Sequence, residues 1–301
     1  MFVIELTYRA SQRADDLPGA VLMKPGLMEK LSLALVIGLA ACGGDDVSGG
    51  GGEDGGSSCG DGRCDASESD GSCAADCADA QPAGQVCTNP VFTTSDPNGG
   101  WSDGGYYVHN NMWNCGDYAC DETLSACSYS SFYVTANMDD ESGDGAVKSY
   151  PNVHKDYEAP TISSFSSLTS TFAATSPQVG IYNLAYDIWL NGVATPDSTE
   201  IMIWTENYNQ VPAGDQAATV TLGGADYDVY RTGDGHYIAF VPSAIMTSGG
   251  IDLLELFDWV ISQGWITDAS TIGQIGYGVE IVSTDDSDAR FDITDFSLTE
   301  R

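Results

Sequence analysis

The chain has 301 residues, enough for one large all-β domain with appended segments. Its 44 acidic residues outnumber 10 basic ones, and the formal net charge of −34 argues against nucleic acid or an anionic membrane surface as a partner. A neutral ligand would not be repelled by this negative charge. The 15 Tyr and 6 Trp residues offer rings that stack on sugars, although all-β domains are often rich in aromatic residues.

The N-terminal region has the pattern of an export signal. Lys24 and Lys30 precede an apolar run at 31–39, which is too short to cross a bilayer. The run ends at Leu39-Ala40-Ala41-Cys42, which resembles the lipobox of bacterial lipoproteins. We therefore expect residues 1–41 to be an upstream extension followed by a signal peptide, and Cys42 to carry the lipid. The alternative is an ordinary signal peptide with an incidental cysteine. Either way the protein is expected outside the cell, secreted or anchored through lipid alone, with the outer membrane favoured.

A tether and a small cysteine-rich module are expected next. Residues 42–57 are mostly Gly, Ser and Asp, which have almost nothing to bury. Residues 58–80 contain four cysteines, too closely spaced to surround a core, so disulfide bonds are expected there. Calcium binding by acidic side chains, or zinc binding by the thiolates, is the alternative for this module. The four cysteines are Cys59, Cys64, Cys73 and Cys77, and the acidic side chains are Asp61, Asp65, Glu68 and Asp70.

The remainder, residues 84–301, reads as short strands separated by Gly, Asn, Asp and Ser turns. One stretch at 250–264 has helical spacing and ends at Gly264. Many strands with one helix predict an all-β jelly-roll sandwich of two antiparallel sheets. The expected strands are 105–113, 128–137, 145–150, 160–168, 179–190, 200–206, 218–222, 226–231, 236–241, 275–283 and 290–298.

Two of these strands place an acid on the face opposite their apolar residues. Side chains alternate between the two faces of a strand. In the run 200–204, Glu200 therefore shares a face with Met202 and Trp204, while two isoleucines lie behind them. The strand 182–190 places Asp187 in the same way. Glycoside hydrolysis needs two carboxyl groups flanking the scissile bond. Glu280, on a glycine-containing strand, is the second candidate, although sequence spacing alone cannot pair it with Glu200.

From Cys87 to Leu298 the chain resembles glycoside hydrolase family 12, the jelly-roll endoglucanases and xyloglucanases. The similar segments occur in the family's order, and the lone helix lies where the family has one. The segments are Asn110-Asn111-Met112-Trp113, Val147-Lys148-Ser149-Tyr150-Pro151-Asn152, Ala185-Tyr186-Asp187, Glu200-Ile201-Met202-Ile203-Trp204, Val211-Pro212-Ala213-Gly214 and Gly278-Val279-Glu280.

The resemblance implies a retaining endo-β-1,4-glucanase that hydrolyses cellulose, mixed-linkage β-glucan or xyloglucan. Glu200 would be the nucleophile, Glu280 the acid/base, and Asp187 a neighbouring acid that tunes the nucleophile. Asn111 and Trp113 would bind glucose units on the non-reducing side. Met202 and Trp204 would line the cleft under the cleaved sugar. Tyr277 and Pro212 complete the expected substrate contacts.

The resemblance also implies disulfide pairs. Cys87 would bond to Cys127, which leaves Cys115 and Cys120 to close a small local loop. We expect no cofactor and no metal in the catalytic domain, because the three histidines form no HExxH motif. A monomer is expected. Two alternatives remain open: a non-catalytic glucan-binding lectin-like protein, and a surface adhesion protein whose cysteine-rich module is the active part.

Overall fold

The structure is a computed structural model that describes residues 84–115, 120–139, 143 and 145–301. The expectations for residues 1–41, 42–57 and 58–80 lie outside the described residues. The same holds for Cys42 and for the four cysteines between 59 and 77.

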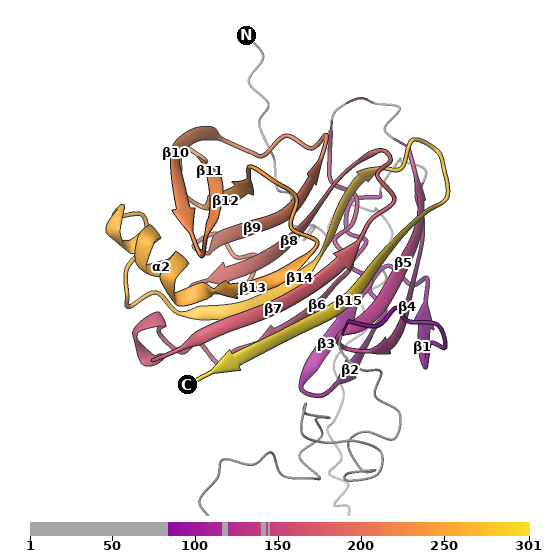
Figure 1. Cartoon of the computed structure of the whole chain (residues 1–301), viewed down its shortest axis with the longest axis horizontal. Coiled ribbons are helices and arrows are strands. Elements are labelled where there is room, and N and C mark those ends of the chain that lie inside the picture. The colour runs from indigo at the N-terminus through magenta and orange to yellow at the C-terminus, as the bar shows by residue number, and fades with distance from the viewer. Residues whose placement is uncertain (1–83, 116–119, 140–142, 144) are drawn as a thin grey trace, which may run out of the picture. The chain divides into compact units, whose positions relative to one another are not determined.

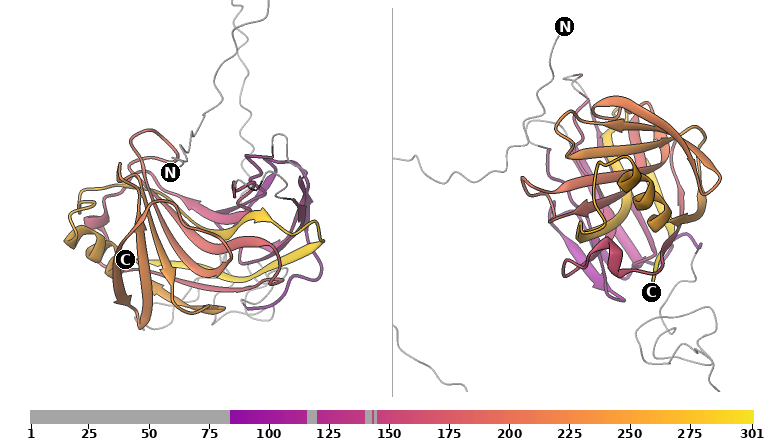
Figure 2. Two further views of the ribbon diagram at one scale, coloured as in Figure 1. Left: turned by 90° about the horizontal axis from the view of Figure 1, so that it is seen from above. Right: turned by 90° about the vertical axis from the view of Figure 1, so that its left-hand side faces the viewer.

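The described residues fold into two β-sheets that pack face to face (Figure 1). The smaller sheet has six strands in the order β1 (Phe92–Thr94), β4 (Cys120–Ser128), β5 (Ser131–Met138), β15 (Ala289–Glu300), β7 (Leu168–Thr175) and β13 (Ser248–Asp252). The larger sheet has nine strands in the order β10 (Asp215–Leu222), β11 (Ala225–Arg231), β12 (Tyr237–Pro242), β9 (Thr199–Tyr208), β8 (Ile181–Leu190), β14 (Ile272–Ser283), β6 (Asn152–Asp156), β3 (Tyr106–His109) and β2 (Gly100–Asp103). Figure 2 shows the long strands bending as they cross the sandwich.

The main core lies between the sheets, and β8 shows why the sequence folds this way. Its alternate residues are all buried in the inter-sheet core. These residues are Tyr182, Leu184, Tyr186, Ile188 and Leu190. The residues between them, Asp187 among them, face the other side of the larger sheet. This confirms the two faces predicted for the strand, and the all-β sandwich with one α-helix is confirmed for the described residues.

The α-helix α2 (Leu253–Ser262) packs at the end of the sandwich near β12 (Figure 1). Asp252 caps its N-terminus by accepting hydrogen bonds from the backbone N–H groups of Leu254 and Glu255. Its end is followed by Gly264 at a φ of +73°, a conformation that favours glycine. The side chain of Trp259 meets Phe240 of β12 with ring centres 5.4 Å apart. Within the described residues, no helix combines the length and apolarity needed to cross a bilayer.

Several predicted strands are wrong. The segment 145–150 forms a loop with one isolated bridge residue, Ser149, and the strand β6 begins only after Pro151. The segment 160–168 begins with a proline and contains a short 3-10 helix, Ile162–Ser164, while the strand β7 runs from Leu168 to Thr175. Proline restricts its own φ and lacks an N–H, so it disfavours a strand interior.

The strand pairing also differs from the expectation in one place. The pair β9 and β12 is parallel, whereas the sequence analysis expected antiparallel sheets throughout. Its register places Tyr237 opposite Glu200 and Ala239 opposite Met202. The strands β1, β2, β4 and β13 were not predicted as separate elements. Three of them, β1, β2 and β13, are short, with 3, 4 and 5 residues.

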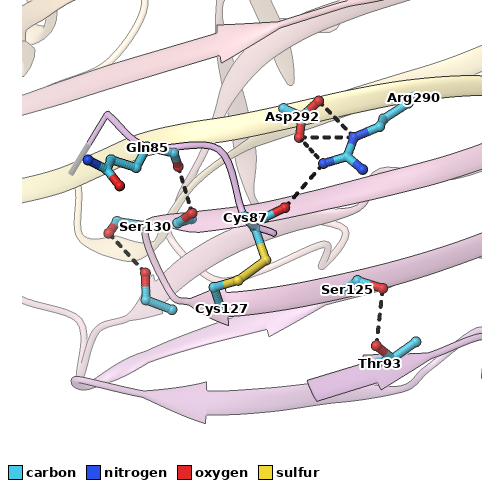
Figure 3. Close-up of a disulfide and its surroundings, with 10 residues drawn as sticks. Gln85, Cys87, Thr93, Ser125, Cys127, Ser130, Arg290 and Asp292 are labelled. Carbon is cyan, nitrogen blue, oxygen red and sulfur yellow. Dashed lines mark hydrogen bonds and ion pairs between the residues drawn. A yellow bond between two sulfur atoms is a disulfide. The ribbon is translucent and has the colours of Figure 1, made fainter. Parts of the chain in front are cut away.

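Two disulfide bonds involve the smaller sheet: one ties the start of the described region to β4, and the other closes a short loop at the first residue of β4. Cys87 is bonded to Cys127, and Cys115 to Cys120, the pairing that the family resemblance implies. Figure 3 shows the first bond and its surroundings. Arg290 donates a hydrogen bond of 3.3 Å to the carbonyl oxygen of Cys87 and forms an ion pair with Asp292. The segment before β1 is thereby attached to β4 and to β15.

Candidate active site

Three carboxyl groups lie on neighbouring strands of the larger sheet, on the face away from the main core. Glu200 is on β9, Asp187 on β8 and Glu280 on β14, and β8 lies between the other two strands. Glu200 pairs with Trp189 across β8, and Glu280 pairs with Asn183 across the same strand. Asp187 therefore lies between the two glutamates, both across the sheet and along the strand direction.

The three carboxyl groups influence one another electrostatically. Burial raises the pKa of Asp187 to about 8, and the charge of Glu280 adds to the rise. Burial also raises the pKa of Glu200 well above its usual range, with further increases from the charges of Asp187 and Glu280. Like charges held close together cannot all ionise near neutral pH, so the group retains protons that isolated carboxylates would lose.

Glu280 is held through a single oxygen. Its Oε2 accepts a hydrogen bond of 2.5 Å from the amide of Asn183 and one of 3.0 Å from the amide of Gln210. Burial raises the pKa of Glu280, and these two hydrogen bonds oppose the rise because they stabilise the ionised form. Gln210 follows β9, the strand that carries Glu200.

The site contains buried polar atoms that have no hydrogen-bond partner. Among the described residues, these include Asn183 Oδ1, Asp187 Oδ1 and Gln210 Oε1. An unpaired buried polar atom is costly, and folded proteins satisfy most of them. Three such atoms around two carboxyl groups indicate that the site is completed by a polar ligand or by water.

Two glycines on β14 leave space on the sheet surface beside the carboxyl groups. Gly276 lies opposite both His154 and Asp187, and Gly278 lies opposite both Asn152 and Ala185. A Cβ atom on Gly278 would lie 2.7 Å from the Cβ of Asn152, closer than such atoms approach in proteins. Only glycine fits at this position, and its missing side chain leaves the central strand open beside Asp187.

Two loops, one after β3 and one before β6, place Asn111 and Tyr150 beside these strands. Asn111 donates its side-chain amide to the carbonyl oxygen of Tyr150 at 3.2 Å, and its own carbonyl oxygen accepts the backbone N–H of Tyr150 at 3.0 Å. The Tyr150 hydroxyl donates to the carbonyl oxygen of Ala185 on β8 at 3.0 Å. Burial raises the pKa of Tyr150, and the charges of Asp187, Glu280 and Glu200 add to the rise. The Tyr150 hydroxyl thus contacts the strand that carries Asp187.

Trp113 is close in sequence to Asn111 and is 54% exposed, unusual for an indole. This exposure leaves the ring accessible for a ligand to stack on it. Pro212 is partly exposed and lies two residues after Gln210, in the loop that follows β9.

Met202 and Trp204 lie on the face predicted for them, but they are 1% and 0% exposed. Together with Ala185 and Ala239 they form a second small apolar cluster, covered by Tyr230, Tyr237 and Val241 from β11 and β12. They therefore form a buried apolar layer rather than an open surface.

Tyr277 was expected to contact the substrate, and this expectation is wrong. It is 0% exposed and belongs to the inter-sheet core, where its ring lies 4.8 Å from that of Tyr186 and its hydroxyl is 2.9 Å from Thr205 Oγ1. The reason is strand alternation: Gly276 and Gly278 face the carboxyl groups, so the residue between them points to the opposite face.

Strand alternation places Asn183 on the same face of β8 as Asp187, the face expected beside Glu200, but no sequence pattern assigned it a role. Gln210 was not predicted. Gln210 lies in a loop, and no periodic signal identifies it.

His154 is a further neighbour on this face. Its Nδ1 lies 2.7 Å from Asn152 Oδ1, and burial lowers its pKa to about 4, which keeps the imidazole neutral. The ring of His109 lies 6.0 Å away, and burial lowers the pKa of this histidine too. Two neutral rings beside the glycine positions extend the polar face toward β3.

The arrangement can perform acid–base and nucleophilic chemistry with carboxyl groups alone. One glutamate that remains protonated can give a proton to a departing oxygen, while a second, ionised carboxylate attacks or stabilises a cation. Within the described residues, no three His, Cys, Asp or Glu side chains form a group that could hold a metal ion.

A family model and several known proteins match this chain. The family model described as glycosyl hydrolase family 12 matches residues 104–299, more than half of the chain. The chain is 26% identical over 222 residues to endoglucanase S of Pectobacterium parmentieri, covering 64% of this chain and 81% of that protein. It is 28% identical over 209 residues to xyloglucan-specific endo-beta-1,4-glucanase A of Emericella nidulans, covering 65% of this chain and 86% of that protein.

Solved structures share the fold. A family 12 xyloglucanase from Bacillus licheniformis superimposes with a TM-score of 0.63 at 23% identity, covering 70% of this chain and 100% of that one. The xyloglucanase domain of NopAA from Sinorhizobium fredii, in complex with cellobiose, gives a TM-score of 0.59 at 25% identity, covering 71% and 100% of the two chains.

Proposed function

We propose, on the premise that the chain belongs to glycosyl hydrolase family 12, that it is a retaining endo-β-1,4-glucanase. Its substrates would be internal bonds of cellulose, mixed-linkage β-glucan or xyloglucan. The observation that carries the proposal is the group formed by Glu200, Asp187 and Glu280 on three adjacent strands, with raised pKa values and unpartnered polar atoms around it.

In the proposed mechanism Glu280 is the acid/base and Glu200 the nucleophile. Glu280 gives its proton to the glycosidic oxygen as that oxygen leaves the sugar, and Glu200 forms a bond to the anomeric carbon. Water then attacks the same carbon, Glu280 takes a proton from this water, and Glu200 departs. Glu280 must be protonated for the first step, which agrees with its raised pKa.

Asp187 would adjust the nucleophile. It lies between the two glutamates, and its charge raises the pKa of Glu200. With a pKa of about 8, Asp187 is itself mostly neutral at neutral pH, and a neutral neighbour allows Glu200 to ionise.

Substrate contacts would come from two regions. Trp113, with its exposed ring, and Asn111 would bind glucose units on the non-reducing side. Met202 and Trp204 would support the cleaved sugar from beneath, and Pro212 would lie at the edge near Gln210. Two relatives, an endoglucanase and a xyloglucan-specific endo-β-1,4-glucanase, support a glucan as the substrate.

The cellular context belongs to the same proposal. The lipobox-like segment ending at Cys42 supports export and a lipid anchor. The protein would act as a monomer on extracellular glucan. Palmitate labelling of the full chain, compared with Cys42→Ser, tests the anchor directly.

The catalytic proposal is tested by reducing-sugar release from carboxymethyl cellulose, barley glucan and tamarind xyloglucan. We expect release from at least one of them, and a loss of at least 10³-fold in both Glu200→Gln and Glu280→Gln. Proton NMR of the first product should show the β-anomer. Glucan binding without release would instead identify a lectin-like module, and release undiminished in Glu200→Gln would defeat the assignment of the nucleophile.

A further inference from the structure

We propose that Asn183 and Gln210 are positioning residues that hold Glu280 by Oε2, so that Oε1 is the oxygen that carries the transferable proton. The inference rests on the proposed function, because it concerns the acid/base of that reaction. Its basis is geometric: two amide groups from different elements converge on one carboxyl oxygen, at 2.5 Å and 3.0 Å.

An oxygen that accepts two N–H donors is a poor place for an acidic proton. The amide nitrogens of Asn and Gln can only donate, so Oε2 must accept from both. A proton on Oε2 would compete for the same lone pairs. When Glu280 is protonated, the proton is therefore directed to Oε1. Both donors keep the carboxyl plane and its free oxygen in one orientation.

The backbone around Gln210 explains how its side chain reaches β14. Asn209 has a φ of +60°, the left-handed conformation that Asn tolerates, and it donates its amide to the carbonyl oxygen of Gly180 at 3.1 Å. The backbone N–H of Gln210 donates to Asn207 Oδ1 at 2.9 Å. These bonds turn the chain sharply after β9 and fix Gln210 against Glu280. Gln210, in the loop that directly follows the nucleophile strand β9, thus orients the acid/base Glu280 on β14.

The charges around Glu280 make these two amides important. The titratable groups that face it are Asp187 from β8, Glu200 from β9, Tyr150 from the loop before β6, and Tyr237 from β12. All four are acids, and none can stabilise the Glu280 carboxylate by opposite charge. Asn183 and Gln210 are the donors that oppose the effect of burial, so they set how readily Glu280 releases and regains its proton.

The free amide oxygens agree with this orientation. Asn183 Oδ1 and Gln210 Oε1 are buried without a partner. Turning either amide over would place its oxygen against a carboxylate oxygen, which is repulsive whenever Glu280 is ionised. Each amide therefore presents its nitrogen to Glu280 and leaves its oxygen to accept from water or from a sugar hydroxyl.

The test uses Gln210→Met, which keeps the length of the side chain but removes the donor. We expect the alkaline limb of kcat/KM to move upward by roughly one to two pH units, the size expected for losing one hydrogen bond to a charged group. The kcat on an unactivated glucan should fall about tenfold. A dinitrophenyl glycoside, whose leaving group needs no proton, should be affected much less.

The matched control is Gln216→Met on β10. Gln216 also donates its amide to a carboxylate, Asp228, at 2.8 Å, but this pair is exposed. The control should keep the wild-type pH profile. Asn183→Ala is the second variant, assayed after its melting temperature confirms folding, since Asn183 is fully buried. It should shift the alkaline limb in the same direction.

The outcomes separate the two proposals. If wild type releases sugar and Glu280→Gln does not, the proposed function stands. An unchanged alkaline limb in both folded variants, or an equal loss on activated and unactivated substrates, would then overturn the positioning role alone. If the wild type releases no sugar from any glucan, the proposed function itself fails.

Discussion

The indole nitrogen of Trp189 donates a hydrogen bond of 2.9 Å to Oδ2 of Asp187, two residues earlier on the same face of β8. Trp189 is also the cross-strand partner of Glu200. Trp189 therefore contacts Asp187 directly and lies opposite Glu200 on the neighbouring strand. The bond lowers the pKa of Asp187, against the larger effect of burial.

Trp189→Phe should reduce kcat by about two- to tenfold, because it removes one hydrogen bond from Asp187 while keeping an aromatic ring. The measurement is steady-state hydrolysis of the preferred glucan at a fixed pH. The control is Trp259→Phe on α2, which alters an aromatic contact with Phe240 away from the site. A kcat equal to that of the wild type in Trp189→Phe would show that this bond does not contribute to the reaction.

Tyr277 should behave as a core residue. Tyr277→Phe removes the hydrogen bond with Thr205 and should lower the free energy of unfolding by about 1 kcal/mol, with KM unchanged. Tyr277→Ala should cost about 3–5 kcal/mol because it leaves a cavity between the sheets. Urea denaturation and steady-state kinetics measure the two effects. A raised KM in a stably folded Tyr277→Phe variant would restore the original expectation of a substrate contact.

Stability should fall as the pH rises from about 5 to 8, and Glu122 should account for part of this fall. Burial raises the pKa of Glu122 to about 8, against its ordinary value of 4.5, and Ser149 donates a hydrogen bond to it at 2.7 Å. Between these two pH values the folded state holds a proton that the unfolded state has lost. The free energy of unfolding therefore decreases with rising pH, by at most about 1.4 kcal/mol per pH unit for this group.

Glu122→Gln should make the melting temperature less dependent on pH over this range, since the amide cannot ionise. Asp121→Asn, on the exposed side of the same strand, makes the same carboxyl-to-amide change and should leave the pH dependence unchanged. The same slope in wild type and Glu122→Gln would contradict the prediction.

The two described disulfide bonds should differ in their contribution to stability. The Cys87–Cys127 bond closes a loop with a sequence separation of 40, and the Cys115–Cys120 bond one of 5. Loop-closure entropy predicts a loss of roughly 4 kcal/mol when the first is removed by paired Cys→Ala substitutions, and roughly 2 kcal/mol for the second. Thermal denaturation of the two double variants measures this, and an equal or reversed order would count against the chain-entropy account.

The sequence by itself determined the sandwich and the face on which the acids lie. The alternation in residues 182–190 and 200–204 depends only on the two-residue period of a strand, so it could be read without coordinates. Two segments next to prolines were misjudged: 145–150, which precedes Pro151, forms a loop, and 160–168, which begins with Pro160, contains a 3-10 helix.

Only the tertiary structure decided which groups meet. Glu200 and Glu280 are far apart in the chain, and sequence spacing alone could not pair them. The strand order β9, β8, β14 brings their strands to either side of the strand that carries Asp187. Gln210 reaches Glu280 through a loop whose turn depends on Asn207 and Asn209, and no periodicity encodes such a contact. Strand alternation is a local property of the backbone, whereas the order of strands in a sheet and the path of a loop depend on packing across the whole domain.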